Sequence, residues 1–126
     1  MRRLLDADVV IGALDGNDAH HGRARGLFTQ WRADKDACAV SVLNLTEVLI
    51  APSADVARLA AAREAIAALG VTVHQPNEAI GVEAARLRHR HPISLPDAYC
   101  LATAKHTGSA VVSFDEKILK TPPRCR

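Results

Sequence analysis

Short apolar runs alternate along the chain with longer segments in which apolar residues recur at helical spacing. Short apolar runs bounded by turn-forming residues are typical of buried strands, and the helical spacing is typical of amphipathic helices. The predicted strands are residues 3–5, 37–40, 71–73 and 110–114. The predicted helices begin near residue 9 and then cover residues 20–33, 43–50, 54–69, 77–90 and 98–106.

Capping residues support several of these boundaries. Asp8 and Ser41 precede apolar helical segments as N-cap residues, and residues 94–97 form a capping-box pattern. Gly70 and Gly108 follow two helices, where glycine commonly ends them. Because strands that alternate with helices favour parallel pairing, we predict an α/β fold. It is a three-layer α/β/α sandwich with a mainly parallel sheet of four to five strands, built as a single domain over residues 1–126.

Composition narrows the class of protein. At 126 residues and 48% hydrophobic composition, the chain can bury a sizeable core without disulfides. The three cysteines form no C-x-x-C pair, which argues against a zinc site or a redox dithiol. No apolar run approaches the roughly 18 residues that a membrane span needs, and Asp6 interrupts the N-terminal apolar run. We therefore expect a cytoplasmic protein that does not bind membranes.

Charge alone does not decide whether the partner is a nucleic acid. The formal net charge is only +2, whereas non-specific phosphate binding usually shows as a concentrated basic patch. Aromatic residues make up 3% of the chain, and proteins that bind single strands without sequence preference need several aromatic platforms. Any recognition of RNA must therefore rest on phosphates and shape.

Separated carboxylates form the candidate site. Asp6 and Asp115 each follow a predicted strand directly, and the carboxyl ends of parallel strands form the edge where open α/β sheets bind ligands. Asp97 lies in the first turn of an Ala-rich helix, whose small residues allow close approach to the sheet. We therefore expect Asp97 near the same edge.

Glu47 supplies a separate physical argument. On a helix its neighbours at three and four residues are Leu43, Ile50 and Ala51, so a carboxylate shares the stripe that should face the core. A buried unpaired carboxylate is costly. We therefore expect a positive partner beside Glu47.

A divalent metal ion is the simplest counter-charge for converging carboxylates. Two carboxylates about 4 Å apart repel by roughly 4 kcal/mol at an effective dielectric near 20. Mg²⁺ and Mn²⁺ prefer oxygen ligands and support phosphodiester cleavage. Each acid also has an ordinary explanation: Asp6 as a turn residue, Asp97 as a capping acid, Asp115 as a loop residue and Glu47 as the partner of an arginine. Asp8 is an N-cap that is also close enough to Asp6 to join the site.

Four segments of the chain resemble the PIN-domain family, in particular the VapC-type toxins of prokaryotic toxin-antitoxin pairs. Residues 4–11 resemble the family's opening strand, and residues 41–48 resemble the helix that bears its glutamate. Residues 95–104 resemble the third acidic segment, and residues 112–115 resemble its Ser/Thr-x-Asp ending. The segments occur in the family's order and cover nearly the whole chain.

The resemblance implies a metal-dependent endoribonuclease, usually a homodimer, that a cognate antitoxin inhibits. It implies that the catalytic carboxylates hold Mg²⁺ or Mn²⁺, with a supporting hydroxyl from Ser113. The implied carboxylates are Asp6, Glu47, Asp97 and Asp115. Our predicted metal ligands are Asp6, Asp97 and Asp115, with Asp8 in a supporting role. The segment after Asp115 departs from the family, because a last strand is not evident there.

Two further groups of side chains are open to more than one interpretation. Arg86, Arg88 and Arg90 lie at a predicted helix C-terminus before Asp97, where they either hold RNA phosphates or complement the helix dipole. His20 and His21 look like a metal-binding pair, but adjacent helical residues do not face one another and no third ligand is evident. Phe28 and Trp31 have the spacing of core or dimer-interface residues.

Two alternatives to the nuclease stay open. Residues 6–10 also resemble the D-x-D-x-[TV] signature of haloacid-dehalogenase-like phosphatases, with Asp6 as nucleophile and Asp8 as acid/base. That interpretation employs Ser41 and Lys105, but leaves Glu47 and Asp97 without roles. The second alternative is a non-catalytic PIN-like module that binds RNA or a protein partner. The presence of all four carboxylates argues against it.

Overall fold

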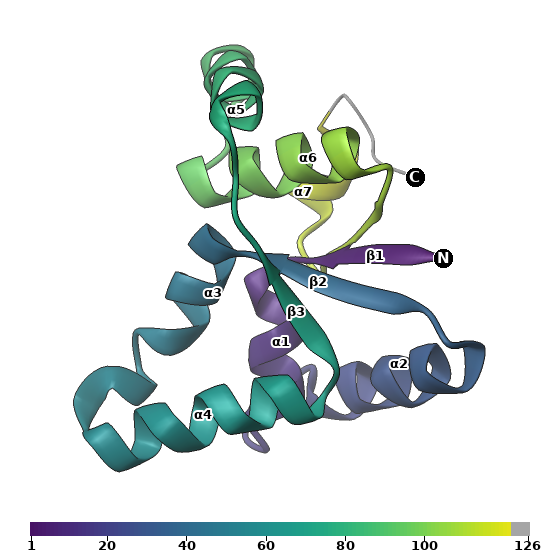
Figure 1. The fold of residues 1–126 in the computed structure, drawn as a ribbon, viewed down its shortest axis with the longest axis vertical. Helices are drawn as coiled ribbons and strands as arrows, with labels where there is room; N and C mark the ends of the chain where they lie inside the picture. Colours follow the sequence, from purple (N-terminus) through teal and green to yellow (C-terminus); the bar gives the residue numbers. More distant parts are fainter. Residues whose placement is uncertain (122–126) are drawn as a thin grey trace.

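A parallel sheet of four strands forms the middle layer of the molecule (Figure 1). The strands are β1 (Arg2–Leu5), β2 (Ala37–Ser41), β3 (Val71–His74) and β4 (Ala110–Val112), in the spatial order β3-β2-β1-β4. All three neighbouring pairs are parallel, so every connection crosses over through helices. These elements belong to a computed structural model, which describes residues 1–121.

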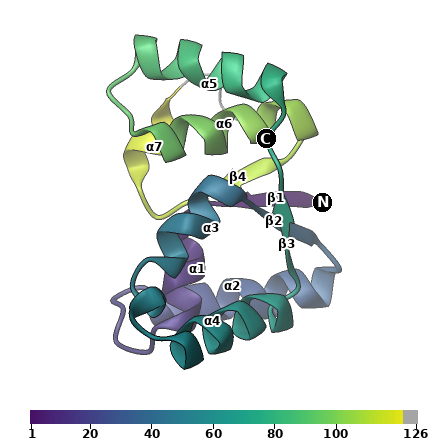
Figure 2. The same cartoon turned by 60° about the vertical axis from the view of Figure 1, so that its left-hand side comes forward.

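Helices cover both faces of the sheet (Figures 1 and 2). One face carries α1, α2 and α4, the other carries α5, α6 and α7, and α3 lies at the carboxyl end of β2. The helices are α1 (Ala7–Leu14), α2 (His21–Asp34), α3 (Val42–Leu49), α4 (Val56–Ala68), α5 (Glu78–Arg90), α6 (Leu95–Thr107) and α7 (Glu116–Lys120), with a 3₁₀ turn at Pro52–Ala54. The predicted α/β/α sandwich is therefore confirmed.

The strands separate two hydrophobic cores because their side chains alternate between the faces. Leu5 is buried with Val9, Phe28 and Trp31 under α1 and α2. Its neighbour Leu4 is buried in the opposite core, which includes residues of α5 and α6. Phe28 and Trp31 therefore belong to the core; their rings meet edge to face with centroids 4.9 Å apart.

Several predicted boundaries hold, and two are wrong. Ser94 caps α6 by accepting a hydrogen bond from the Asp97 backbone N–H, and Gly108 ends α6 with a φ of +66°. The predicted cap of α1 is wrong: Asp6 is the N-cap, while Asp8 lies inside the first turn. The predicted strand 110–114 ends at Val112 instead.

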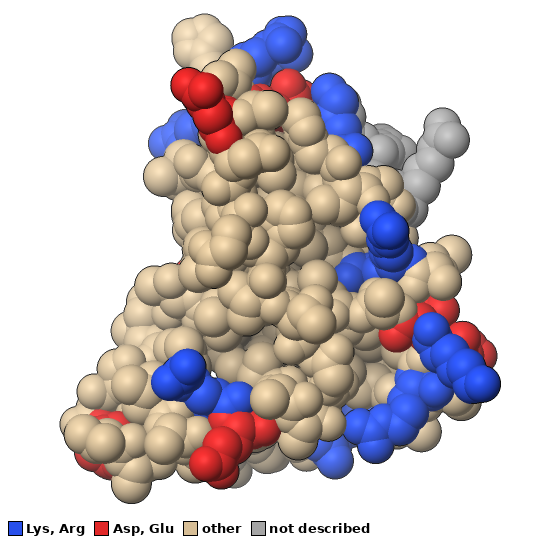
Figure 3. Space-filling model, viewed as in Figure 1, with Lys and Arg blue, Asp and Glu red and all other residues tan. Residues whose placement is uncertain are grey.

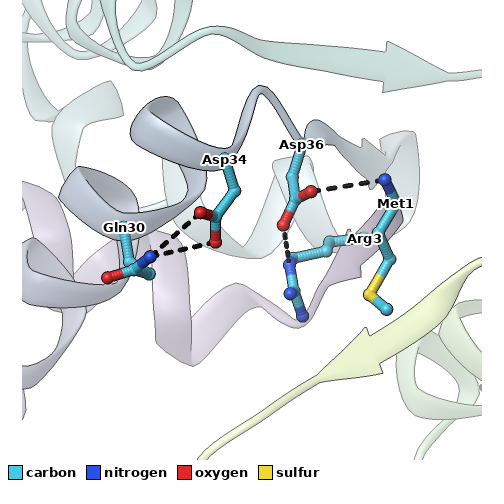
Figure 4. A network of polar contacts seen from close by, with 5 residues as sticks. All are labelled: Met1, Arg3, Gln30, Asp34 and Asp36. Carbon is cyan, nitrogen blue, oxygen red and sulfur yellow. Dashed lines mark hydrogen bonds and ion pairs between the residues drawn. The ribbon is translucent and has the colours of Figure 1, made fainter.

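The amino ends of the strands are tied together by Asp36 (Figure 4). Its carboxylate accepts a hydrogen bond from the Arg3 Nε at 2.8 Å and contacts the Met1 amino group at 3.3 Å. The Arg3 hydrogen bond lowers the pKa of Asp36. This network holds β1 against the α2–β2 turn, at the edge opposite the carboxyl ends where the candidate site lies.

No helix within residues 1–121 combines the length and the apolar composition that a membrane span requires.

Candidate active site

Asp6 lies at the junction of β1 and α1, at the carboxyl edge of the sheet, and it is buried. Its Oδ1 accepts a hydrogen bond from the Ala7 backbone N–H at 2.8 Å. Its Oδ2 accepts one from the Ser113 hydroxyl, also at 2.8 Å. The position follows from the local fold, because Asp6 comes directly after β1 and is the N-cap of α1. Asp6 is therefore fixed from both sides.

The segment after β4 holds Asp8. The Phe114 backbone N–H donates to Asp8 Oδ2 at 3.0 Å, and the Ser113 hydroxyl lies 3.4 Å from the same oxygen. The other oxygen, Oδ1, is buried and has no hydrogen-bond partner within residues 1–121. Asp8 therefore lies against Asp6 with one carboxylate oxygen unsatisfied.

Glu47 joins the site through Asn44, a residue that the sequence interpretation missed. Asn44 is fully buried on α3, and its Nδ2 lies 3.2 Å from Glu47 Oε1, 3.5 Å from Asp6 Oδ1 and 3.5 Å from the Pro96 carbonyl oxygen. The ordinary explanation of Glu47 as the partner of an arginine is wrong, because none of the ion pairs of residues 1–121 includes Glu47. A neutral amide takes the place of an arginine.

The predicted stripe around Glu47 is also partly wrong. Ile50, which follows the last residue of α3, is 68% exposed. The face of α3 that carries Glu47 therefore does not face the core at the C-terminal end of the helix. The buried positions of the helix are Asn44 and Val48. Glu47 is half-buried because it faces the carboxyl edge of the sheet, where the other acids lie.

Asp97 and Asp115 reach the site in different ways. Asp97 is in the first turn of α6, whose Ala98 and Ala102 are fully buried where the helix packs on the sheet. Asp115 is exposed; its Oδ1 caps α7 by accepting the Lys117 backbone N–H at 2.9 Å. Its own N–H donates to Ser113 Oγ at 3.0 Å. Asp115 thus lies at the rim, tied to the buried acids through Ser113.

The electrostatics show that these acids share one region. Burial raises the pKa of Asp6 to about 7, and the charges of Asp8 and Asp97 add to the rise. Burial also raises the pKa values of Asp8 and Asp97, and in both cases the charge of Asp115 contributes. Burial raises the pKa of Glu47, to which Asp97 and Asp8 also contribute. Five carboxylates therefore repel one another, and among residues 1–121 none of them forms an ion pair with a lysine or arginine.

The donor chemistry fits a hard divalent cation. Carboxylate oxygens are the preferred ligands of Mg²⁺ and Mn²⁺, and the buried Asp8 Oδ1 has an unused acceptor position. Within the part of the chain that the structure describes, no three His, Cys, Asp or Glu side chains stand in the arrangement of a complete metal site.

The remaining predicted residues are spread around the site. Arg86 lies 3.9 Å from Glu83 on the exposed side of α5, while Arg88 and Arg90 are exposed at the C-terminal end of that helix. On the face in Figure 3, basic side chains form a run at the lower right, over α2, with a few acidic side chains next to them. An RNA contact by the three arginines stays a prediction.

A comparison with protein families identifies the chain. The family model for the PIN domain matches residues 3–122. The chain belongs to the PIN-domain family. A comparison with curated proteins found no match. The haloacid-dehalogenase alternative is therefore wrong, and the structure agrees. Lys105 is exposed and bonded to Glu83 on α5 at 3.0 Å, while the Ser41 hydroxyl is buried and has no hydrogen-bond partner among residues 1–121.

Solved PIN-domain structures share the fold at low sequence identity. A toxin-antitoxin complex from Klebsiella pneumoniae matches with a TM-score of 0.75 at 20% identity, covering 96% of this chain and 92% of the other. VapC20 of Mycobacterium tuberculosis, described as a sarcin-ricin loop cleaving toxin, matches with a TM-score of 0.73 at 20% identity and covers 92% of both chains. VapBC2 from Rickettsia felis, bound to a promoter DNA fragment, gives 0.76 at 14% identity, covering 98% and 96%.

Proposed function

We propose that this PIN-domain protein is a metal-dependent endoribonuclease, and that it acts in the cytoplasm as the toxin of a toxin-antitoxin pair. The observation that carries the proposal is the set of carboxylates around buried Asp6, whose pKa values are raised by burial and by their mutual repulsion. Among residues 1–121, none of these carboxylates forms an ion pair with a lysine or arginine. Leaving such charges unmatched is costly. The cluster is therefore suited to bind a divalent cation together with an RNA phosphate.

The residues have distinct roles in this proposal. Asp6, Asp97 and Asp115 hold Mg²⁺ or Mn²⁺, and Glu47 completes the catalytic set. When bound, such an ion would neutralise the carboxylates and stabilise the charge that develops at the phosphodiester. Ser113 orients Asp6 through its 2.8 Å hydrogen bond. Asn44 keeps Glu47 against Asp6 without adding charge.

A cleavage assay tests the function. Purified protein is incubated with a mixture of structured RNAs and Mg²⁺ or Mn²⁺, alongside Asp97→Asn and the control Asp34→Asn. Asp34 is an exposed acid at the end of α2, bonded to Gln30 (Figure 4). We expect chelator-sensitive cleavage that falls at least 100-fold in Asp97→Asn and is unchanged in Asp34→Asn. Full cleavage by Asp97→Asn would show that Asp97 is not part of the active site. RNA that stays intact with the wild type would favour the binding module.

The proposed partners are an RNA substrate, a cognate antitoxin and a second copy of the chain. The similar structures include toxin-antitoxin complexes, which supports an antitoxin. A cavity of about 520 Å³ opens beside Glu47 and is lined by apolar side chains that include Ile11, Leu14 and Val48. An antitoxin segment seated there would cover Glu47. Analytical ultracentrifugation tests the homodimer, and co-purification with the product of an adjacent gene for a small DNA-binding protein tests the antitoxin.

A further inference from the structure

Arg23, Phe114 and His20 form a stack of side chains beside the acidic site. The His20 and Phe114 ring centroids lie 4.5 Å apart, with 30° between the ring planes. The Arg23 Cζ lies 4.7 Å from the centroid of the same Phe114 ring. His20 and Arg23 are both exposed and lie one helical turn apart at the start of α2. The ring of Phe114 therefore joins α2 to the segment after β4.

This stack is attached directly to the carboxylates. The backbone N–H of Phe114 donates to Asp8 at 3.0 Å. The residue before it, Ser113, bonds to Asp6, and the residue after it is Asp115. One short segment thus carries the ring under Arg23 and also contacts the buried acids. The contact with Phe114 therefore places Arg23 next to the segment that bonds the acids.

The guanidinium of Arg23 is free to bind an anion. Among the ion pairs of residues 1–121, none involves Arg23. The nearby acid Asp18 uses its Oδ1 to accept the His20 backbone N–H. Arg3 provides a contrast: its guanidinium lies over Trp31 at 5.4 Å, but its Nε is bonded to Asp36. Stacking orients a guanidinium while leaving its in-plane N–H donors available for a phosphate.

RNA needs such a contact because the site is strongly acidic. A single metal ion offsets only part of the repulsion between several carboxylates and a phosphodiester chain. An arginine held beside the acids attracts the neighbouring phosphate without entering the metal site. Its planar fork of donors suits a phosphate better than an ammonium does.

We propose that Arg23, oriented by Phe114, binds a phosphate of the RNA strand next to the cleaved bond. The proposal rests on the proposed ribonuclease function and names a part of its substrate site. His20 supports it by packing on the same ring. Arg23 is thus an RNA contact on α2, on a different element from the three arginines of α5.

Binding measured without divalent metal separates this contact from cleavage. A fluorescently labelled pool of single-stranded RNA is titrated with protein in EDTA, and fluorescence anisotropy is followed at several salt concentrations. The variants are Arg23→Gln, Arg23→Lys and the control Arg25→Gln. Arg25 is an exposed arginine of the same helix without a ring contact among the described residues. Circular dichroism and Tm confirm that each variant is folded.

We expect Arg23→Gln to weaken RNA binding about 10-fold and to reduce the slope of log K against log salt by roughly 0.7, as loss of one phosphate contact requires. Arg23→Lys keeps the salt slope but binds more weakly, because an ammonium lacks the planar fork. Arg25→Gln changes binding less than twofold. Equal affinity and slope for Arg23→Gln and wild type would overturn the proposal, as would undetectable RNA binding by the wild type.

Different results would refute the proposed function and the proposed RNA contact. If the wild type binds RNA through Arg23 but never cleaves it with Mg²⁺ or Mn²⁺, the contact stands and the nuclease is wrong. If the wild type cleaves RNA and Arg23→Gln binds and cleaves as well, the nuclease stands and the contact is wrong.

Discussion

Replacing Asp6 with asparagine should stabilise the metal-free protein. Asparagine keeps the shape of the side chain and removes its charge. Its Oδ1 accepts the Ala7 N–H, as the Asp6 Oδ1 does now. Its Nδ2 donates to Ser113 Oγ, and the Ser113 hydroxyl then donates to Asp8 Oδ2, 3.4 Å away. The hydrogen bonds of this buried position are therefore retained while the unfavourable charge is lost.

The pKa of Asp6 sets the size and the sign of the effect. Burial and the charges of Asp8 and Asp97 raise this pKa from 3.8 to about 7, so the folded protein binds the proton more tightly than the unfolded chain does. The stability gained from protonation is complete below the unfolded pKa and is lost as the pH rises to about 7. Three pKa units correspond to about 4 kcal/mol as an upper limit. Because asparagine also loses hydration, we expect Asp6→Asn to be about 2–4 kcal/mol more stable than wild type at pH 8.

Urea unfolding in EDTA from pH 5 to 8.5 measures this difference. The gap between Asp6→Asn and wild type should open as the pH rises and should close when Mg²⁺ is added, since the ion stabilises only the wild-type carboxylate cluster. Asp36→Asn is the matched control of opposite sign, because the Arg3 hydrogen bond lowers the pKa of Asp36. That variant should lose stability at neutral pH. Equal or lower stability of Asp6→Asn at pH 8 in EDTA would refute the electrostatic reasoning.

Two further predictions concern α3 and the core. Asn44→Leu removes the amide that bridges Glu47 and Asp6, and should weaken Mn²⁺ binding, measured by electron paramagnetic resonance of the free ion, by about 10–100-fold; unchanged binding would show that the amide has no role toward the metal. Leu5→Ala removes a fully buried side chain and should lower the free energy of unfolding in urea by about 2–5 kcal/mol. The control Leu119→Ala changes a side chain that is 42% exposed and should alter stability by about 0.5 kcal/mol or less. Similar losses for the two variants would contradict the assigned core.

The parallel sheet and its edge acids were predictable because they depend on local pattern. Buried parallel strands appear as apolar runs, and an acid that ends such a run lies at the carboxyl edge. This reasoning placed Asp6 and Asp115 at that edge, where the structure has them. Ser94 and Gly108 marked the ends of α6 for the same reason, since capping chemistry is local.

Asn44 was missed because its environment comes from distant parts of the chain. A polar residue in a helix normally faces solvent, yet Asn44 is fully buried against Asp6 and the carbonyl of Pro96. Only the packing of α3 against α6 creates that environment. A signal was present nonetheless: Asn44 lies three residues before Glu47 and so shares its helix face. The interpretation placed apolar neighbours on that face and overlooked the amide.

The wrongly predicted end of β4 lies at the candidate active site. The apolar pattern predicted a strand to residue 114, but the strand ends at Val112 because the Ser113 hydroxyl and the Phe114 N–H bond to Asp6 and Asp8 instead of extending the sheet. The same two residues connect to Asp115 and Arg23. A segment that leaves the sheet to bond the acids therefore also sets the position of the proposed RNA contact.

Ser113→Ala tests that connection. Alanine removes both the donor to Asp6 and the acceptor for the Asp115 N–H, so the segment that carries Phe114 should loosen, and RNA binding in EDTA should weaken although Ser113 is buried. Ser113 acts on the RNA contact through Phe114 and Arg23. Ser113→Ala should therefore weaken RNA binding less in the Arg23→Gln variant than in the wild-type protein. Anisotropy of the two single variants and the double variant measures this coupling. Fully additive losses would mean that Ser113 supports the carboxylates without positioning the ring beneath Arg23.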